Sequence, residues 1–151
     1  MTAHHILVPL DFSDYANYAL DYAIALADTF QARLTLLHIL HLSPLAVGDM
    51  PPTIMDTYLR DLETEAQHMM QASLERVESA GLEGESVIAQ GIPFQLIIDT
   101  ARDRQIDLII MGTHGRTGLT HALIGSVAEK VVRLAPCPVL VTRGQSDIQT
   151  P

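Results

Sequence analysis

The chain has little of several residue types that particular classes of protein require. Its 151 residues include one cysteine and no tryptophan, and nine basic against eighteen acidic residues give a formal net charge of −9. A single cysteine excludes an internal disulfide, and the acidic balance opposes binding to nucleic acid, which depends on cationic contacts. The apolar runs are only as long as a strand, and no signal sequence is recognisable near the start. We therefore expect a cytoplasmic protein without nucleic-acid partners or membrane insertion.

The residues that are abundant favour an α/β protein. Hydrophobic residues make up 48% of the chain and aromatic residues only 5%, so the core must consist mainly of aliphatic side chains, as in buried parallel sheets. The length suits a single domain. We expect this domain to cover residues 1–144 and to be followed by a short polar tail, 145–151.

Strand-like and helix-like segments alternate along the chain. The predicted strands are His5–Asp11, Arg33–Leu40, Glu85–Ala89, Leu108–Gly112 and Pro138–Arg143. The predicted helices are Asp14–Phe30, Pro52–Ala80, Pro93–Arg104 and Ser126–Leu134. Alternation of this kind requires parallel pairing through helical crossovers, which predicts a three-layer sandwich.

A glycine-rich segment follows the fourth predicted strand. Gly112 and Gly115 are separated by two residues, and nine residues separate Gly115 from Gly125, which precedes Ser126 at the start of a helix. Glycine permits close backbone approach, and a helix N-terminus offers N–H donors to an anion. The segment therefore predicts a phosphate-binding loop, although glycines after a strand can also form a simple turn.

The spacing differs from two common nucleotide-binding motifs. Ser126 stands where a P-loop would have lysine, and the glycines do not follow the first strand in the G-x-G-x-x-G pattern. The spacing instead resembles the nucleotide-binding motif of the universal stress protein family. The similarity extends through the segment Ala135–Val141 and covers the chain from His5 to Arg143.

This resemblance implies a Rossmann-like fold with a five-stranded parallel sheet of order 3-2-1-4-5, similar to the adenine nucleotide alpha hydrolases. Ligands of such sheets bind where the strand order reverses, beyond the carboxyl ends of the strands. The first predicted strand ends at Asp11, just past Pro9, and Asp11 resembles the acidic residue of the family's first signature. Its carboxylate is suited to accept hydrogen bonds from ribose hydroxyls or to help hold a metal ion on the phosphates. Alternatively, Asp11 is the N-cap of the first helix.

The resemblance also places the backbone of Ile39 against the adenine edge, and Arg116 is the cation that we expect to reach the phosphates. The predicted binding residues are Pro9, Leu10, Asp11, Ser13, Ile39, Met111, Gly112, His114, Gly115, Arg116, Gly125, Ser126 and Val127. The expected ligand is ATP, ADP or AMP. It should bind together with Mg²⁺ or Mn²⁺, held mainly by the phosphates.

No nucleophile–base or acid–base pair stands out near this loop, so binding without catalysis is expected. Seven histidines lack the spacing of a zinc site, so no protein-held metal is predicted. The function implied is that of a nucleotide-dependent regulatory or stress-response factor with a protein partner. Two alternatives remain: a family member that acts through protein contacts without nucleotide, and a slow ATP hydrolase. The family resemblance and the apolar fifth strand, Val139–Val141, predict a homodimer through that strand.

Overall fold

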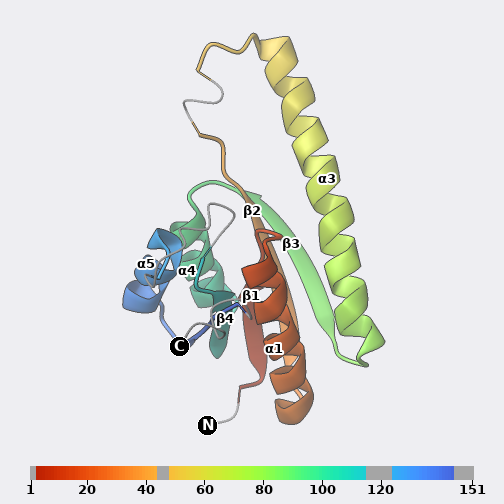
Figure 1. Cartoon of the computed structure of the whole chain (residues 1–151), viewed down its shortest axis with the longest axis vertical. Helices are drawn as coiled ribbons and strands as arrows, with labels where there is room; N and C mark the ends of the chain where they lie inside the picture. Colours follow the sequence, from red (N-terminus) through yellow and green to blue (C-terminus); the bar gives the residue numbers. More distant parts are fainter. Residues whose placement is uncertain (1–2, 44–47, 115–123, 145–151) are drawn as a thin grey trace.

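Five parallel strands form one sheet in the computed structural model, which describes residues 3–43, 48–114 and 124–144 (Figure 1). The strands are β1 (His5–Pro9), β2 (Arg33–Leu40), β3 (Gly84–Gln90), β4 (Leu108–Gly112) and β5 (Val139–Thr142). The helices are α1 (Asp14–Phe30), α3 (Pro52–Ser79), α4 (Pro93–Asp103) and α5 (Ser126–Leu134). The strand order is β3-β2-β1-β4-β5, so the predicted fold class and topology are confirmed.

Two apolar clusters lie on opposite faces of the sheet, because successive strand residues point to opposite sides. Ile6 and Val8 of β1 belong to the cluster beneath α1 and α3, whereas Leu7 between them belongs to the cluster beneath α4 and α5. Figure 1 shows the two pairs of helices on either side of the strands. This is the predicted three-layer sandwich.

Helix α1 begins as the sequence predicts. Ser13 is its N-cap, and the Ser13 hydroxyl accepts a hydrogen bond from the backbone N–H of Ala16 at 3.2 Å. Its buried face consists mainly of alanine, which permits a close approach to the sheet. A Cβ atom at Gly112 would lie 2.9 Å from the backbone of Tyr15. Gly112 therefore lets α1 pack directly against the end of β4.

The first strand is shorter than predicted, because it ends at Pro9 and not at Asp11. Leu10 N–H still donates to the Leu37 carbonyl at 2.8 Å, but Phe12 then adopts a positive φ of 63° and turns the chain into α1. Strand β5 is likewise shorter than the predicted Pro138–Arg143. Residues 145–151 lie outside the described part of the chain, so the predicted tail stays a prediction.

The order of the sheet fixes where a ligand site can form. Strand β1 pairs with β2 on one side and with β4 on the other, in parallel register. The chain leaves β1 towards β2 and returns to the other side at β4, so the carboxyl ends of β1 and β4 border the point of reversal. The glycine-rich segment follows β4 and therefore starts at this point.

Candidate functional site

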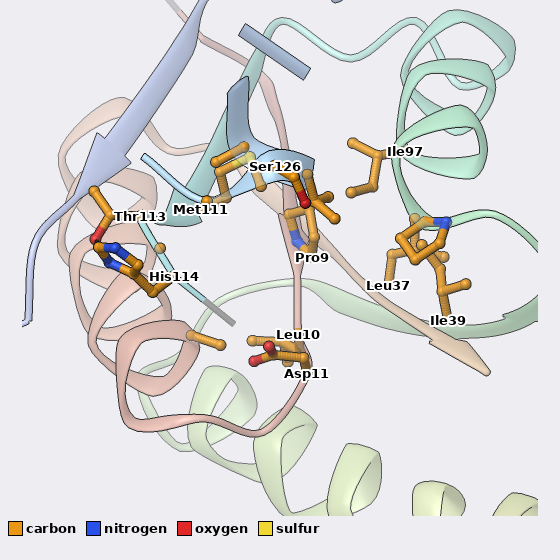
Figure 2. Close-up of a pocket in the computed structure, with 16 residues that line it drawn as sticks. Pro9, Leu10, Asp11, Leu37, Ile39, Ile97, Met111, Thr113, His114 and Ser126 are labelled. Atoms are coloured by element: carbon orange, nitrogen blue, oxygen red, sulfur yellow. The ribbon is translucent and has the colours of Figure 1, made fainter. Parts of the chain in front are cut away.

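A cavity of about 220 Å³ lies at the carboxyl ends of β1 and β4. Figure 2 shows Leu37 and Ile39 on one side, Thr113 and His114 on the other, and Asp11 and Ser126 between them. Small-molecule sites commonly measure about 300–1,000 Å³. The cavity formed by the described residues therefore lies just below this range.

The wall formed by β1 carries the carboxylate of Asp11. Its Oδ1 accepts hydrogen bonds from the backbone N–H of Ser13 at 3.0 Å and from the Ser13 hydroxyl at 2.6 Å. Ser13, and not Asp11, caps α1. The capping alternative for Asp11 is thus not observed, and the carboxylate is held at the rim of the cavity by the residue that does cap the helix.

The opposite wall is the N-terminus of α5, where Gly125 is the N-cap without a side-chain capping bond. The first N–H groups of a helix have no acceptor within the helix and carry a partial positive charge. Gly125 N–H donates to the Thr113 carbonyl at 2.7 Å, which ties the start of α5 to the end of β4. A Cβ at position 125 would lie 2.9 Å from that same carbonyl oxygen. The glycine is therefore needed for close backbone contact, while its φ of −60° is ordinary.

His114 follows β4 and contributes its imidazole ring to the lining of the cavity. Its Nδ1 lies 3.1 Å from the Thr113 hydroxyl, and its ring lies against Tyr15 with centroids 5.2 Å apart. Its Nε2 atom is buried and has no hydrogen-bond partner in the described part of the chain.

The remaining surface of the cavity is largely apolar. Sequence reasoning missed several lining residues, namely Ala16, Leu37, Pro93, Ile97, Thr113 and Ala128. Most of these are aliphatic residues within regular elements, and nothing in the sequence separates them from ordinary core residues. The resulting combination of an apolar surface, one carboxylate and a helix N-terminus suits a ligand with both a flat apolar part and an anionic part.

The structure brings most of the predicted binding residues together at this cavity. Those that line it are Pro9, Leu10, Asp11, Ile39, Met111, Gly112, His114, Gly125, Ser126 and Val127. Ser13 is not among the lining residues, but its hydroxyl donates a hydrogen bond to Asp11. Gly115 and Arg116 lie outside the described residues. Lys130 of α5 is not among the lining residues, and its Nζ lies 4.6 Å from the centre of the Phe94 ring.

Within 3–43, 48–114 and 124–144, no group of three His, Cys, Asp or Glu side chains is arranged to hold a metal ion. Burial, followed by the nearby Asp107 carboxylate, raises the pKa of the Cys137 thiol. A raised pKa keeps the thiol protonated and unreactive near neutral pH. Over the same residues, no helix is long and apolar enough to cross a bilayer.

Comparison with known proteins gives a consistent picture. The model of the universal stress protein family matches residues 2–143. The universal stress protein YxiE of Bacillus subtilis is 31% identical, and the match covers 91% of this chain and 97% of that protein. The universal stress protein MJ0531 of Methanocaldococcus jannaschii is 34% identical over 91% of this chain and 81% of its own length.

Solved structures agree with the sequence matches. MJ0577, also from Methanocaldococcus jannaschii, superposes with a TM-score of 0.84 at 31% identity and covers 95% of this chain and 97% of its own. UspA of Lactobacillus plantarum gives a TM-score of 0.81 at 32% identity. Two more distant structures share the fold: a universal stress protein in complex with cAMP, at 20% identity, and one from Archaeoglobus fulgidus in complex with dAMP, at 24%.

Proposed function

This chain belongs to the universal stress protein family, and from that premise we propose that it binds ATP or ADP and acts as a nucleotide-dependent regulatory factor in a stress response. The observation that carries the proposal is the uncapped N-terminus of α5 facing the carboxylate of Asp11 across one cavity. A donor-rich helix end attracts phosphate, and a carboxylate accepts hydrogen bonds from ribose hydroxyls. These two groups on opposite walls match the two polar parts of a nucleotide.

The apolar part of the cavity supports a position for the base. Leu37 and Ile39 of β2 line this part, together with Pro93 and Ile97 of α4. An adenine ring packed there would leave its edge facing the backbone of Ile39. The distant relatives of the same fold that were solved with cAMP and dAMP make an adenine nucleotide the first ligand to test.

The phosphates in this arrangement lie at Gly125 and Ser126. No lysine or arginine is among the described residues that line the cavity, so the described part of the site would neutralise the phosphate charge through N–H groups and the Ser126 hydroxyl. A Mg²⁺ or Mn²⁺ ion would be held mainly by the phosphate oxygens. Arg116, outside the described residues, stays a candidate for an additional contact.

We further propose that binding, and not turnover, is the activity. Under this proposal the bound nucleotide changes how the protein is recognised by a regulatory partner. The two competing functions make different predictions: a protein that acts without nucleotide would show no binding, and a slow hydrolase would convert ATP to ADP over hours.

The test combines two measurements on the purified chain. Native mass spectrometry should detect an adenine nucleotide that is carried through purification. Calorimetry with adenosine, AMP, ADP and ATP, each with and without Mg²⁺, should then show affinity that increases with the number of phosphates. Absence of binding for all four ligands would refute the proposal, and chromatography of the ATP sample after overnight incubation would detect hydrolysis.

The apolar edge of the sheet supports a homodimer as part of this proposal. Both β3 and β5 are edge strands, but β3 carries Glu85 and polar neighbours, whereas β5 consists of Val139, Leu140, Val141 and Thr142. Charged residues protect an edge from pairing, and an uncharged apolar edge invites it. Leu140 is 37% exposed. Pairing of β5 with the same strand of a second copy would cover both its backbone and its side chains.

A further inference from the structure

His38 is a buried histidine in the middle of an otherwise aliphatic part of β2. Its neighbours Leu37 and Ile39 line the cavity, whereas His38 does not. Because side chains alternate across a strand, His38 lies on the other face of the sheet. It therefore cannot contribute to the site by touching a ligand there.

The contacts of His38 are with the segment that follows β1. Its Nδ1 lies 2.7 Å from the carbonyl oxygen of Leu10, a residue 28 positions earlier in the chain. A carbonyl only accepts hydrogen bonds, so Nδ1 must carry the proton and donate it. The imidazole ring also stacks on the ring of Phe12, with centroids 4.4 Å apart and an angle of 29° between the planes.

These two contacts hold a segment whose backbone is otherwise unfavourable. Phe12 has a φ of 63°, in the left-handed region that residues other than glycine rarely adopt. Asp11 lies between the two contact points, Leu10 and Phe12, and its carboxylate forms one wall of the cavity. Fixing the residues on both sides of Asp11 fixes the direction in which Asp11 presents its carboxylate.

We propose that His38 is a positioning residue for the nucleotide site: it holds the Leu10–Phe12 turn from behind the sheet, so that Asp11 faces the ribose. The expected effect on nucleotide affinity rests on the proposed function. The effect of His38 on the turn can be measured without any nucleotide. Histidine suits the position because a single ring supplies both an N–H donor and a flat stacking surface.

Two substitutions separate the donor from the stacking surface. Asparagine places its amide N–H close to the position of Nδ1, so His38→Asn retains the donor and loses most of the stacking. Phenylalanine has the reverse effect, and His38→Phe leaves the buried Leu10 carbonyl without a partner. We expect ADP to bind about tenfold more weakly to His38→Phe, because this variant loses one buried hydrogen bond. The affinity of His38→Asn, which retains the donor, should stay within about threefold of wild type.

The experiment measures ADP affinity by calorimetry in both variants, after circular dichroism has shown that each retains the wild-type spectrum. No loss of ADP affinity in His38→Phe would overturn the proposal. Hydrogen exchange at the Ser13 amide, which donates to Asp11, supplies a local measure of the turn. It should become faster in His38→Phe and stay near the wild-type rate in His38→Asn.

A third measurement needs only the unliganded wild-type chain. Nitrogen-15 chemical shifts should show that Nδ1 of His38 is protonated, and an unprotonated Nδ1 would overturn the proposal even if a variant failed to fold. If wild type binds no ADP, the proposed function fails, while the exchange rates and the tautomer still decide whether His38 holds the turn. The two failures are thus distinguishable.

Discussion

At the scale of single residues, neighbouring atoms rather than backbone angles make glycine necessary at positions 112 and 125. In the described part of the chain, the glycines with positive φ are Gly81 and Gly91. Gly112 has no room for a Cβ because of Tyr15, and Gly125 has none because of Thr113. Gly112 therefore allows α1 to pack against β4, and Gly125 allows the start of α5 to approach the backbone of Thr113 beside the cavity.

Replacement of Gly125 by alanine should damage the site more than the fold. The new Cβ would lie 2.9 Å from the Thr113 carbonyl, which is backbone and cannot rotate away. Overpacking of this kind costs roughly 1–3 kcal/mol, and the displaced α5 N-terminus should lower ATP affinity by about tenfold or more. Gly84→Ala is the matched control, because its Cβ would meet only side-chain atoms of Leu74 and Val77. Calorimetry that found equal ATP affinity in both variants would contradict this assignment.

Ser126 allows recognition of phosphate to be separated from recognition of the nucleoside. Loss of one hydroxyl contact in Ser126→Ala should weaken ATP binding by about tenfold, or about 1.4 kcal/mol, and should leave adenosine affinity nearly unchanged. The measurement is a pair of titrations with ATP and adenosine. Equal losses for the two ligands would place Ser126 away from the phosphates.

At the scale of elements, a chain of polar contacts joins three strands and α4 at the amino end of the sheet. His5 Nε2 and the Thr35 hydroxyl are 2.7 Å apart, the hydroxyl donates to Glu85 at 2.7 Å, and Arg104 donates to the same carboxylate. The hydroxyl has one proton and gives it to Glu85, so His5 must donate through Nε2. Its other nitrogen, Nδ1, is buried.

This network should make the fold sensitive to acid. Burial, with a further contribution from Arg33, lowers the pKa of His5, and hydrogen bonds from Thr35 and then Arg104 lower the pKa of Glu85. A folded-state pKa below the unfolded one means that the unfolded chain binds more protons, so stability is complete above the unfolded pKa and falls as pH decreases. For His5 the loss should begin below about pH 6.5, and for Glu85 below about pH 4.5.

The measurement is the free energy of unfolding in urea at pH 7.5 and pH 5.5. Wild type should be less stable at pH 5.5, and His5→Gln, whose amide can still donate to Thr35 but does not titrate, should lose less between the two values. A variant with the same pH dependence as wild type would exclude His5 as the source. His4→Gln, one position earlier on the exposed surface, is the control.

Sequence patterns predicted regular elements more accurately than turns. The bounds of α1 were predicted because apolar spacing along a helix is a local property. The predicted end of β1 is two residues too late, because the chain turns at Phe12, whose ring contacts His38, a residue distant in sequence. Likewise, Leu37 and Ile97 could not be distinguished from core residues, since only the topology brings them to the cavity.

The glycine spacing and Asp11 did identify the location of the cavity. Asp11 follows β1 and the glycine-rich segment follows β4, and these two strands are neighbours in the sheet. The local patterns were therefore sufficient to locate the cavity once the strand order was known. The contact of these residues with a nucleotide stays a prediction, as do the cytoplasmic location and the regulatory partner.

At the scale of the whole molecule, the two edges of the sheet should differ in their tendency to associate. Leu140→Glu introduces a charge on the apolar strand β5, and we expect it to convert a dimer into a monomer with little change in the circular dichroism spectrum. Ile54→Glu is the matched control, because Ile54 is an exposed apolar residue on α3. Sedimentation velocity at micromolar concentration measures the outcome, and a monomeric wild type would exclude the dimer.

The cavity is the place where the two apolar clusters meet. Leu10 and Ala16 belong to the cluster under α1 and α3, whereas Leu37, Ile97 and Met111 belong to the cluster under α4 and α5, and all of them line the cavity. A ligand bound there would contact both halves of the interior at once. Ligand present at about one hundred times its dissociation constant adds roughly 2.7 kcal/mol to the free energy of unfolding. Under the proposed function, the thermal midpoint and the cellular lifetime of the chain would therefore rise and fall with the nucleotide supply.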